Sequence, residues 1–367
     1  MVINESNSSE ESIHEILRRT LSPQIAVSSS CGFANPIEKL EASNQSVFAV
    51  IGRGTCGTVF EVAGSKIAIK KGSDKYGLWV DANITHEASR AVMEMKVYLE
   101  SIFPGSSIPL VPQVHGWVHD EELEKWWYIN RSQFPDDDNE IGFLFYVERI
   151  LPLPEATRTA LIRKYFPREF QDISLRDPSN RTCLIRPYLG MRRTDHELKH
   201  PAETLQNFPL HLDQMEEIGL DIAQFSREMA IGLAIIHWRV GSMINPFSVP
   251  VRNMARRPTH LWMLDFDKTS KLDFNDWKKA RGRMVTAVTG NDPYFPNPAT
   301  SGEKEKLVWS NFEEVYLQAA RAVLKMHPTL SEKARTRKYP EAFLIDWKKR
   351  AQSLEETKDG SFMKFVG

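Results

Sequence analysis

The spacing of apolar residues changes several times along the chain. Residues 47–71, VFAVIGRGTCGTVFEVAGSKIAIKK, form short β-like runs broken by glycine, which predicts adjoining strands. Residues 85–103 have helical spacing instead, and one face of this predicted helix carries Ala88, Val92, Met95, Leu99 and Ile102. Strand-like runs follow at residues 126–129 and 142–150, and the prolines of ERILPLP end the second run.

The rest of the chain is predicted to be mainly helical. Residues 215–240 are a candidate for one long helix, and the apolar run HLWMLDF at residues 260–266 is a candidate strand. The first 40 residues are rich in Ser, Glu and Asn, which indicates a mobile leader, although the amphipathic stretch at residues 13–21 could dock as a helix. We therefore predict an α+β protein with a leader at residues 1–40, a small β-rich lobe at 41–150 and a larger helical lobe at 151–367.

Composition narrows the classes of function. The net charge is −1 and the pI is about 6.8, so any contact with nucleic acid must come from a local basic patch. Cys31, Cys56 and Cys183 are too widely spaced for a disulfide framework or a zinc site, and we expect no bound metal. No apolar run reaches the roughly 20 residues that span a bilayer. These features predict a soluble, cytoplasmic protein without a membrane partner.

The glycines of the strand region follow a phosphate-binding pattern. Gly52, Gly54 and Gly57, followed by Val59, read GxGxxGxV. Residues without a Cβ let backbone amides approach phosphate oxygens closely. An ordinary hairpin turn would use the same glycines, so the pattern alone leaves both interpretations open.

Further motifs follow in the order found in protein kinases. Lys70 lies in the segment AIK, and Glu94, on the predicted helix, is expected to be its ion-pair partner. FYVERI resembles a kinase hinge in which Val147 would border the nucleotide base, and Asp265 in LDF stands where a kinase carries a metal-binding carboxylate. Together these motifs resemble a bilobal protein kinase, although Lys70 and Glu94 could also be a purely structural ion pair.

One part of the kinase pattern is missing. Residues 229–264 contain no Asp and no Glu, and Met243 and Ile244 stand where the catalytic base of a kinase is expected. Asn245 or Asn253 could replace a metal-binding Asn, but neither amide can accept the proton of an attacking hydroxyl group. The sequence therefore disfavours ordinary protein phosphorylation.

Several sequence blocks indicate what the scaffold does instead. FLFYVERILPLPEATRTALIRKYFP, CLIRPYLGMRR, LAIIHW, LWMLDF and NDPYFPNP resemble a fungal family of kinase-like proteins. One branch of that family is the arginine-containing cyclodipeptide synthases, whose signature is DDxxE. Asp136, Asp137 and Glu140 match this signature. A solvated acidic turn between two strands would look the same, and in a kinase this turn lies away from the nucleotide cleft.

The resemblance implies an activity and its substrates. Such an enzyme forms a cyclo(Arg-Xaa) diketopiperazine from arginyl-tRNA and a second aminoacyl-tRNA, and it needs no cofactor because the aminoacyl ester is already activated. Clustered carboxylates raise one another's pKa, so one of them could deprotonate the attacking amine. A pair of carboxylates could equally bind the guanidinium group of arginine. The sequence leaves both roles open, together with the identity of the second amino acid.

A tRNA substrate requires basic side chains for its phosphates. The candidates are clustered on one predicted helix, at Lys278, Lys279, Arg281 and Arg283. Further basic groups occur at residues 192–193, 256–257, 333–338 and 348–350, and each could instead be a solvated helix face. Two other functions stay open at this point: a phosphotransferase with an unconventional base, and a pseudokinase that acts as a binding module.

Overall fold

Short runs rich in β-branched and aromatic residues pair into one antiparallel sheet. The structure, a computed structural model, describes residues 5–22, 48–54, 56–199, 201–243, 247–248, 260–290, 292–326 and 338–363. The sheet has the order β1-β2-β3-β5-β4. Its strands are β1 (Ala49–Gly54), β2 (Gly57–Glu61), β3 (Ile67–Gly72), β4 (Val114–Trp117) and β5 (Phe143–Glu148). The strands predicted within residues 47–71 and 142–150 are confirmed.

Close packing of the backbone explains one of the glycines. Gly57 pairs with Gly54 across the tip of the β1–β2 hairpin and has a φ of 152°. A Cβ at Gly57 would lie 2.1 Å from the carbonyl oxygen of Lys71 on β3. Any larger residue would therefore push this hairpin away from the sheet.

Each face of the sheet packs against a helix. Phe60, Ile69 and Leu144 point to the outer face, where they pack with Trp127 and Phe134. Trp127 belongs to α4 (Asp120–Asn130), and the 3₁₀ turns η1 (Arg131–Gln133) and η2 (Asp136–Asp138) follow it. The prediction of a strand at residues 126–129 is therefore wrong. Acidic residues in the first turn of α4 favour a helix start there, and Trp127 needs only one buried face.

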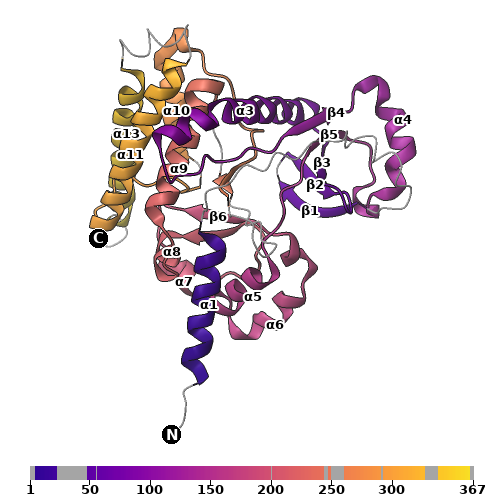
Figure 1. Cartoon of the computed structure of the whole chain (residues 1–367), viewed down its shortest axis with the longest axis horizontal. Coiled ribbons are helices and arrows are strands. Elements are labelled where there is room, and N and C mark those ends of the chain that lie inside the picture. Colours follow the sequence, from indigo (N-terminus) through magenta and orange to yellow (C-terminus); the bar gives the residue numbers. More distant parts are fainter. Residues whose placement is uncertain are drawn as a thin grey trace.

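One long helix joins the sheet to the helical part of the molecule. Helix α3 (Lys75–Ile102) begins ten residues before the predicted start, where the Asp74 side chain accepts a hydrogen bond from the Tyr76 backbone N–H at 3.0 Å. Its buried side contacts β3, β4 and β5 as well as α9 and α11. In Figure 1 it crosses from the sheet to the bundle of helices. The helix thus fixes how the two parts meet.

The helical part is built around α9 (Ile222–Ile235). Nearly all side chains of α9 from Phe225 onward are buried, and α9 packs along α11 (Glu303–Lys325). The remaining helices are α5 (Glu155–Tyr165), α6 (Arg168–Arg176), α7 (Asp195–Lys199), α8 (Leu212–Glu217), α10 (Trp277–Gly290) and α13 (Tyr339–Met363), with 3₁₀ turns η3 (Pro178–Thr182) and η5 (Phe274–Asp276). Two small sheets pair β6 (Ile185–Tyr188) in parallel with β7 (Phe208–His211), and β8 (Phe247–Ser248) with β9 (Trp262–Met263). Of the apolar run at residues 260–266, only Trp262 and Met263 therefore form a strand.

The helix predicted at residues 215–240 is interrupted twice. Gly219 adopts a φ of 70° and ends the first segment, and the Asp221 side chain caps the start of α9 by accepting from the Gln224 backbone N–H at 2.9 Å. After Ile235 the chain widens into a π-helix, η4 (Ile236–Val240). There Trp238 Nε1 donates to the Tyr316 hydroxyl at 3.0 Å, and His237 Nδ1 lies 2.9 Å from the same hydroxyl.

An N-terminal helix docks on the helical part. Helix α1 (Glu5–Leu21) covers the amphipathic stretch at residues 13–21 and contacts α5. Leu17 and Leu21 are 0% and 1% exposed and belong to the main core cluster. The docked helix expected within the leader is therefore present. Among the described residues, no helix is long and apolar enough to cross a membrane.

The core contains one carboxylate that lacks an ion-pair partner among the described residues. Glu228 on α9 is fully buried, and its Oε1 accepts from the Ser107 backbone N–H and from Gln224 Nε2, both at 3.0 Å. Its Oε2 has no hydrogen-bond partner within the described part of the chain. Burial raises the pKa of Glu228 from 4.5 to about 7.

This shift predicts a pH-dependent stability that one isosteric substitution removes. Because the pKa is higher in the folded state, the contribution of Glu228 is fully present below about pH 4.5 and is lost as the pH rises through about 7. At about pH 8, the free energy of unfolding of Glu228→Gln should therefore be about 2–4 kcal/mol higher than that of the wild type. Near pH 4.5 the two proteins should differ little. Urea unfolding at several pH values measures this. Glu314→Gln, on the exposed side of α11, is the control. Parallel pH curves for wild type and Glu228→Gln would contradict the assignment.

Candidate functional site

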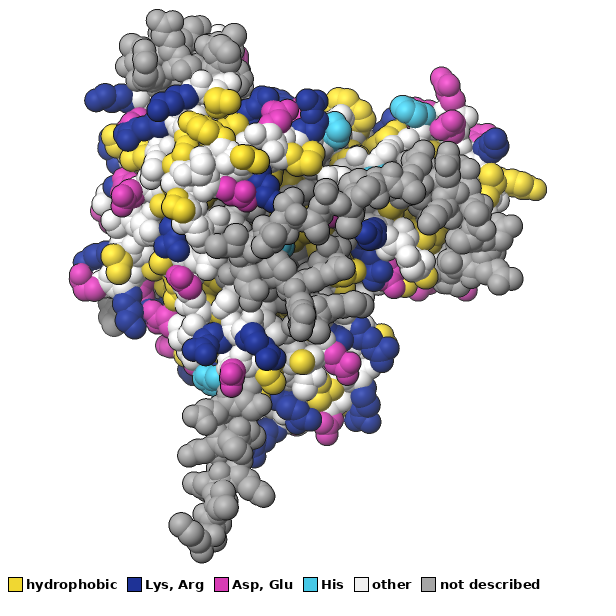
Figure 2. All heavy atoms as spheres, viewed as in Figure 1, with side chains coloured by type: hydrophobic (Ala, Val, Ile, Leu, Met, Phe, Trp, Pro, Cys, Tyr) yellow, Lys and Arg dark blue, Asp and Glu magenta, His cyan; other side chains and the backbone are white. Residues whose placement is uncertain are grey.

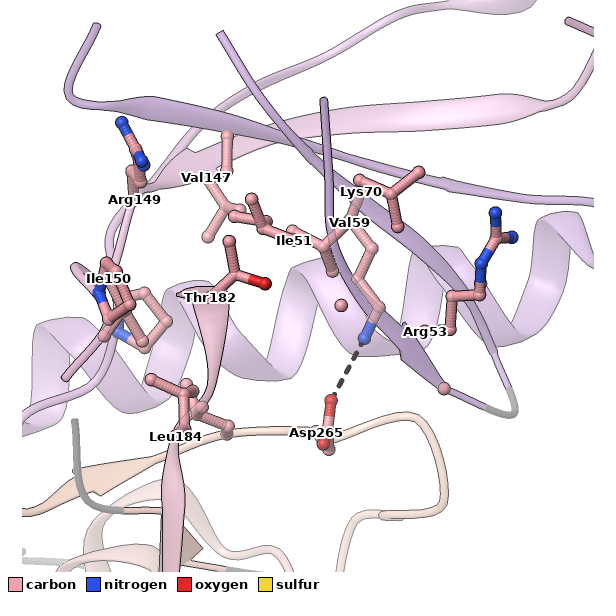
Figure 3. Close-up of a pocket in the computed structure, with 18 of the residues that line it drawn as sticks. Ile51, Arg53, Val59, Lys70, Val147, Arg149, Ile150, Thr182, Leu184 and Asp265 are labelled. Atoms are coloured by element: carbon pink, nitrogen blue, oxygen red, sulfur yellow. Dashed lines mark hydrogen bonds and ion pairs between the residues drawn. The ribbon is translucent and has the colours of Figure 1, made fainter. Parts of the chain in front are cut away.

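A cavity of about 430 Å³ lies between the glycine hairpin and the helical part. The predicted site residues Gly52, Gly54, Gly57, Lys70 and Asp265 all line it. Figure 3 shows Ile51, Val59 and Val147 on one side of the cavity, with Thr182 and Leu184 on the other. The fold therefore brings together predicted site residues from β1, β2, β3 and the segment after β9. Val147, Glu148 and Ile150, from the segment that resembles a hinge, line the cavity too.

Lys70 is the buried charged group of this cavity. Its Nζ lies 2.6 Å from Asp81 Oδ2 and 3.3 Å from Asp265 Oδ1. Burial alone would lower the pKa of Lys70, but the charges of Asp81 and Asp265 outweigh it and raise that pKa above its usual value. Lys70 is therefore a fixed cation held between two carboxylates.

The prediction that Glu94 pairs with Lys70 is wrong. Glu94 forms ion pairs with Arg239 and, at 3.4 Å, with Arg90, and it does not line the cavity. Helix α3 starts so early that Asp81, in its second turn, faces the sheet on the same side as the buried Thr85 and Ala88. The signal for Asp81 was the capping residue Asp74, two helical turns earlier, in a stretch that the spacing of apolar residues did not mark as helical.

Asp81 also fixes the backbone beside Asp265. Its Oδ1 accepts a hydrogen bond from the Phe266 backbone N–H at 3.0 Å. Asp265 itself has a φ of 59°, a left-handed conformation that non-glycine residues seldom adopt. This conformation directs the Asp265 carboxylate toward Lys70 (Figure 3). The next residue holds this conformation in place, because Phe266 is completely buried and its backbone N–H is bonded to Asp81.

The second wall of the cavity comes from residues that the sequence did not single out. Ser179 and Thr182 from η3, and Leu184 and Arg186 beside and within β6, line it. Arg186 donates to Asn207 Oδ1 at 2.8 Å and forms an ion pair with Asp292 at 3.3 Å. Two sequence blocks, CLIRPYLGMRR and NDPYFPNP, contain Arg186 and Asp292, so this ion pair brings the two blocks together in space.

The acidic turn lies next to the cavity but outside it. Asp136, Asp137 and Glu140 are exposed, and none of them lines the cavity. The buried carboxylate of this turn is Asp138, which binds the guanidinium of Arg53 through two hydrogen bonds of 3.0 and 2.6 Å. Arg53 lines the cavity from the glycine hairpin. The turn is therefore attached to the cavity wall by a bidentate ion pair.

The four basic residues predicted to bind tRNA divide into two pairs. Lys278 and Lys279 are exposed on α10. Arg281 forms an ion pair with Asp346 on α13 at 2.8 Å, and Arg283 hydrogen-bonds Ser270. The expectation of one exposed run of four charges is thus wrong, because α10 packs on α13. Basic side chains on the face in Figure 2 occur in separate groups with acidic side chains between them.

Of the other basic groups that the sequence suggested, three described members are paired with carboxylates. Arg192 and Arg193 are paired with Glu216, Glu305 and Asp213, and Lys348 is paired with Glu313. Residues 256–257 and 333–337 lie outside the described residues, as do Asn245 and Asn253.

Neither described cysteine is suited to act as a nucleophile. Burial raises the pKa of Cys56, beside the glycine hairpin, to about 11, and that of Cys183, in the cavity wall, to about 12. Both thiols are therefore protonated near neutral pH, as expected of packing residues.

Comparison with known proteins gives one partial match. Residues 261–328 match the model of the DUF3669 family, described as "Zinc finger protein". This segment, less than a fifth of the chain, contains no cysteine and a single histidine, His327. Within the described residues no three His, Cys, Asp or Glu side chains come together to hold a metal ion. The residues present therefore do not fit a zinc site. No curated protein matches the chain.

Removal of Asp81, the observed partner of Lys70, should cost more stability than removal of Glu94, the partner that the sequence predicted. Asp81→Asn leaves a buried ammonium group with only Asp265 beside it, and should lower the free energy of unfolding by about 3 kcal/mol. Glu94→Gln, the matched control on the same helix, removes a half-exposed partner and should cost less than about 1 kcal/mol. Chemical denaturation measures both variants. Equal losses would contradict the assignment of Asp81 as the partner of Lys70.

Proposed function

We propose that this protein is a cyclodipeptide synthase that forms an arginine-containing diketopiperazine from two aminoacyl-tRNAs. The observation that carries the proposal is the bidentate pair between Arg53 and Asp138. It holds the DDxxE turn against the wall of the cavity, so that both can act on one substrate. The turn before β5 would otherwise be remote from any cleft.

The acidic turn is suited to an arginine substrate. Asp138 already binds a guanidinium in the planar, two-point geometry that carboxylates and guanidinium groups share. The negative charge of Asp137 also acts on Arg53, so Asp137 lies close to that guanidinium. Asp136, Asp137 and Glu140 remain exposed beside it and can bind the side chain of an arginyl group or accept a proton.

The reaction needs only groups of this kind. The α-amine of one aminoacyl group attacks the ester carbon of the other, a C–N bond forms, and the ester C–O bond breaks. The released ribose hydroxyl of the tRNA takes up a proton, and a carboxylate accepts the proton that the attacking ammonium loses. A second attack of the same kind, by the amine of the dipeptidyl ester, closes the ring. The charged tRNAs supply the activated esters, as they would in the cytoplasm.

A kinase-like, bilobal arrangement is part of the proposal. The strand order β1-β2-β3-β5-β4, the glycine hairpin and the Lys70–Asp81 pair support it. The same cavity makes phosphotransfer the second candidate, because Lys70 and Asp265 meet in it. The absence of any Asp or Glu at residues 229–264 weighs against it. Metal-dependent phosphate transfer that is lost on Asp265→Asn would favour this second candidate.

The first test measures product. A host that expresses the chain should accumulate a new arginine-containing diketopiperazine, detected by mass spectrometry of its extract. Asp137→Asn and Glu140→Gln should each lower the yield at least about 100-fold, the scale of losing a general base or a charged substrate contact. Both side chains are exposed, so the thermal unfolding temperature should stay unchanged.

Glu121→Gln, an exposed acid on α4, is the matched control and should leave the yield unchanged. Normal yields from both motif variants would reduce the turn to a surface feature. Product formed from free amino acids and ATP in RNase-treated extract would refute the dependence on tRNA.

The second test measures tRNA binding. Affinity should fall steeply with salt, with a log–log slope of about −0.7 to −0.9 per phosphate contact, because neutralised phosphates release counterions. Lys278→Glu combined with Lys279→Glu should weaken binding and flatten that slope without unfolding the protein. Lys125→Glu, on the exposed side of α4, is a control for a single charge reversal away from α10, to be compared with Lys278→Glu and Lys279→Glu made one at a time. If the double variant keeps the wild-type salt dependence of affinity, α10 does not contact the tRNA.

A further inference from the structure

All four cations that line the cavity already have carboxylate partners. Arg53 pairs with Asp138, Lys70 with Asp81 and Asp265, Arg149 with Glu61, and Arg186 with Asp292. Their positive charges are neutralised within the protein. A triphosphate, with about four negative charges, would find no unpaired cation among the described lining residues. The cavity is better suited to an uncharged ligand.

The walls of the cavity suit a flat base. Val59 and Ala68 of the sheet face Leu184 and Leu264 of the helical part, and Val147 stands at the side. Apolar surfaces on two opposite sides remove both faces of a planar ring from water, which stabilises binding without requiring charge. A volume of about 430 Å³ admits a ligand of nucleoside size.

The 3₁₀ turn η3 closes one side of the cavity. Its residues Ser179 and Thr182 line the cavity, and η3 contacts β1. The part of the cavity where Lys70 and Asp265 meet is its polar end, and beside it Arg53 of the hairpin, 58% exposed at its side chain, reaches solvent. A ligand attached to a long polymer must therefore enter with its free end first.

Lys70 can also donate to this ligand. An ammonium group has three N–H donors, and its two carboxylate partners account for two of them. The third N–H is available to an ester carbonyl at the polar end of the cavity. There it would stabilise the negative charge that develops on the carbonyl oxygen during attack by an amine.

We infer that the cavity binds the aminoacylated adenosine at the 3′ end of a tRNA. The base lies between the apolar walls, the ester lies near Lys70, and the rest of the tRNA leaves past the glycine hairpin. This inference rests on the proposed function, since it names the part of the aminoacyl-tRNA that this cavity binds.

Binding of defined probes tests the site without any turnover. Calorimetric titration should show that adenosine and puromycin, an aminoacyl-adenosine analogue, bind at least as tightly as ATP with Mg²⁺. Leu184→Phe and Ala68→Val place larger side chains on opposite apolar walls of the cavity, and each of these slot variants should weaken puromycin binding at least about 10-fold. Val97→Phe, at a position 79% exposed on α3, is the matched control and should bind normally. Thermal unfolding identifies which slot variants are folded.

The outcomes separate the inference from the proposed function. ATP with Mg²⁺ binding at least about 10-fold more tightly than adenosine would overturn the inference and identify a phosphate site. A folded slot variant with normal diketopiperazine yield would place the adenosine elsewhere, while the synthase proposal stands. Wild-type protein that forms no diketopiperazine would refute the proposed function, whereas the probe titrations judge the adenosine site independently.

Discussion

The buried ammonium group of Lys70 is the interaction on which the arrangement of this molecule depends. It joins β3 to Asp81 of the following helix α3 and to Asp265 of the segment after β9, which lies 195 positions further along the chain. A buried charge is tolerated only with partners, so these three segments must meet at one place. The hydrogen bond from the Phe266 backbone to Asp81 reinforces the same junction. The shape of the cavity follows from it, because the glycine hairpin pairs with β3 and Leu264 precedes Asp265.

The Arg53–Asp138 pair links the glycine hairpin, which lines the cavity, to the acidic turn. Lys71, the neighbour of Lys70, hydrogen-bonds the carbonyl oxygen of Asp138 and lies 5.3 Å from the ring centre of Trp127. Neighbouring residues of β3 thus point to opposite faces of the sheet: Lys70 lines the cavity, and Lys71 contacts the acidic turn. Because neighbouring side chains of a strand point to opposite faces, β3 contacts both the cavity and the acidic turn without any helix between them.

The sequence predicted features whose signals are local. Glycine spacing and β-branched runs located β1 to β3, and the amphipathic pattern located the docked helix α1. Non-local contacts decided the rest. Asp81 replaced Glu94 because the cap at Asp74 starts α3 early, and Trp127 lies on a helix because Phe134 and the outer face of the sheet bury it. Arg281 looked solvated in sequence, but Asp346, 65 positions later, binds it. Arg186, which lines the second wall of the cavity, is held by Asn207 and Asp292, and nothing in its own stretch of sequence indicated these contacts.

The π-helix at residues 236–240 determines the state of its histidine. The Tyr316 hydroxyl accepts the indole N–H of Trp238 at 3.0 Å and lies 2.9 Å from His237 Nδ1, so one hydroxyl group fixes the orientation of both rings. Burial lowers the pKa of His237 to about 3, which keeps the ring neutral throughout the physiological range. The His-Trp pair, which in sequence precedes the segment where a kinase holds its catalytic base, is therefore a buried, neutral element of the core. In the proposed synthase reaction, proton transfer would therefore rest on carboxylates, whereas the imidazole ring of His237 is a rigid, neutral part of the core.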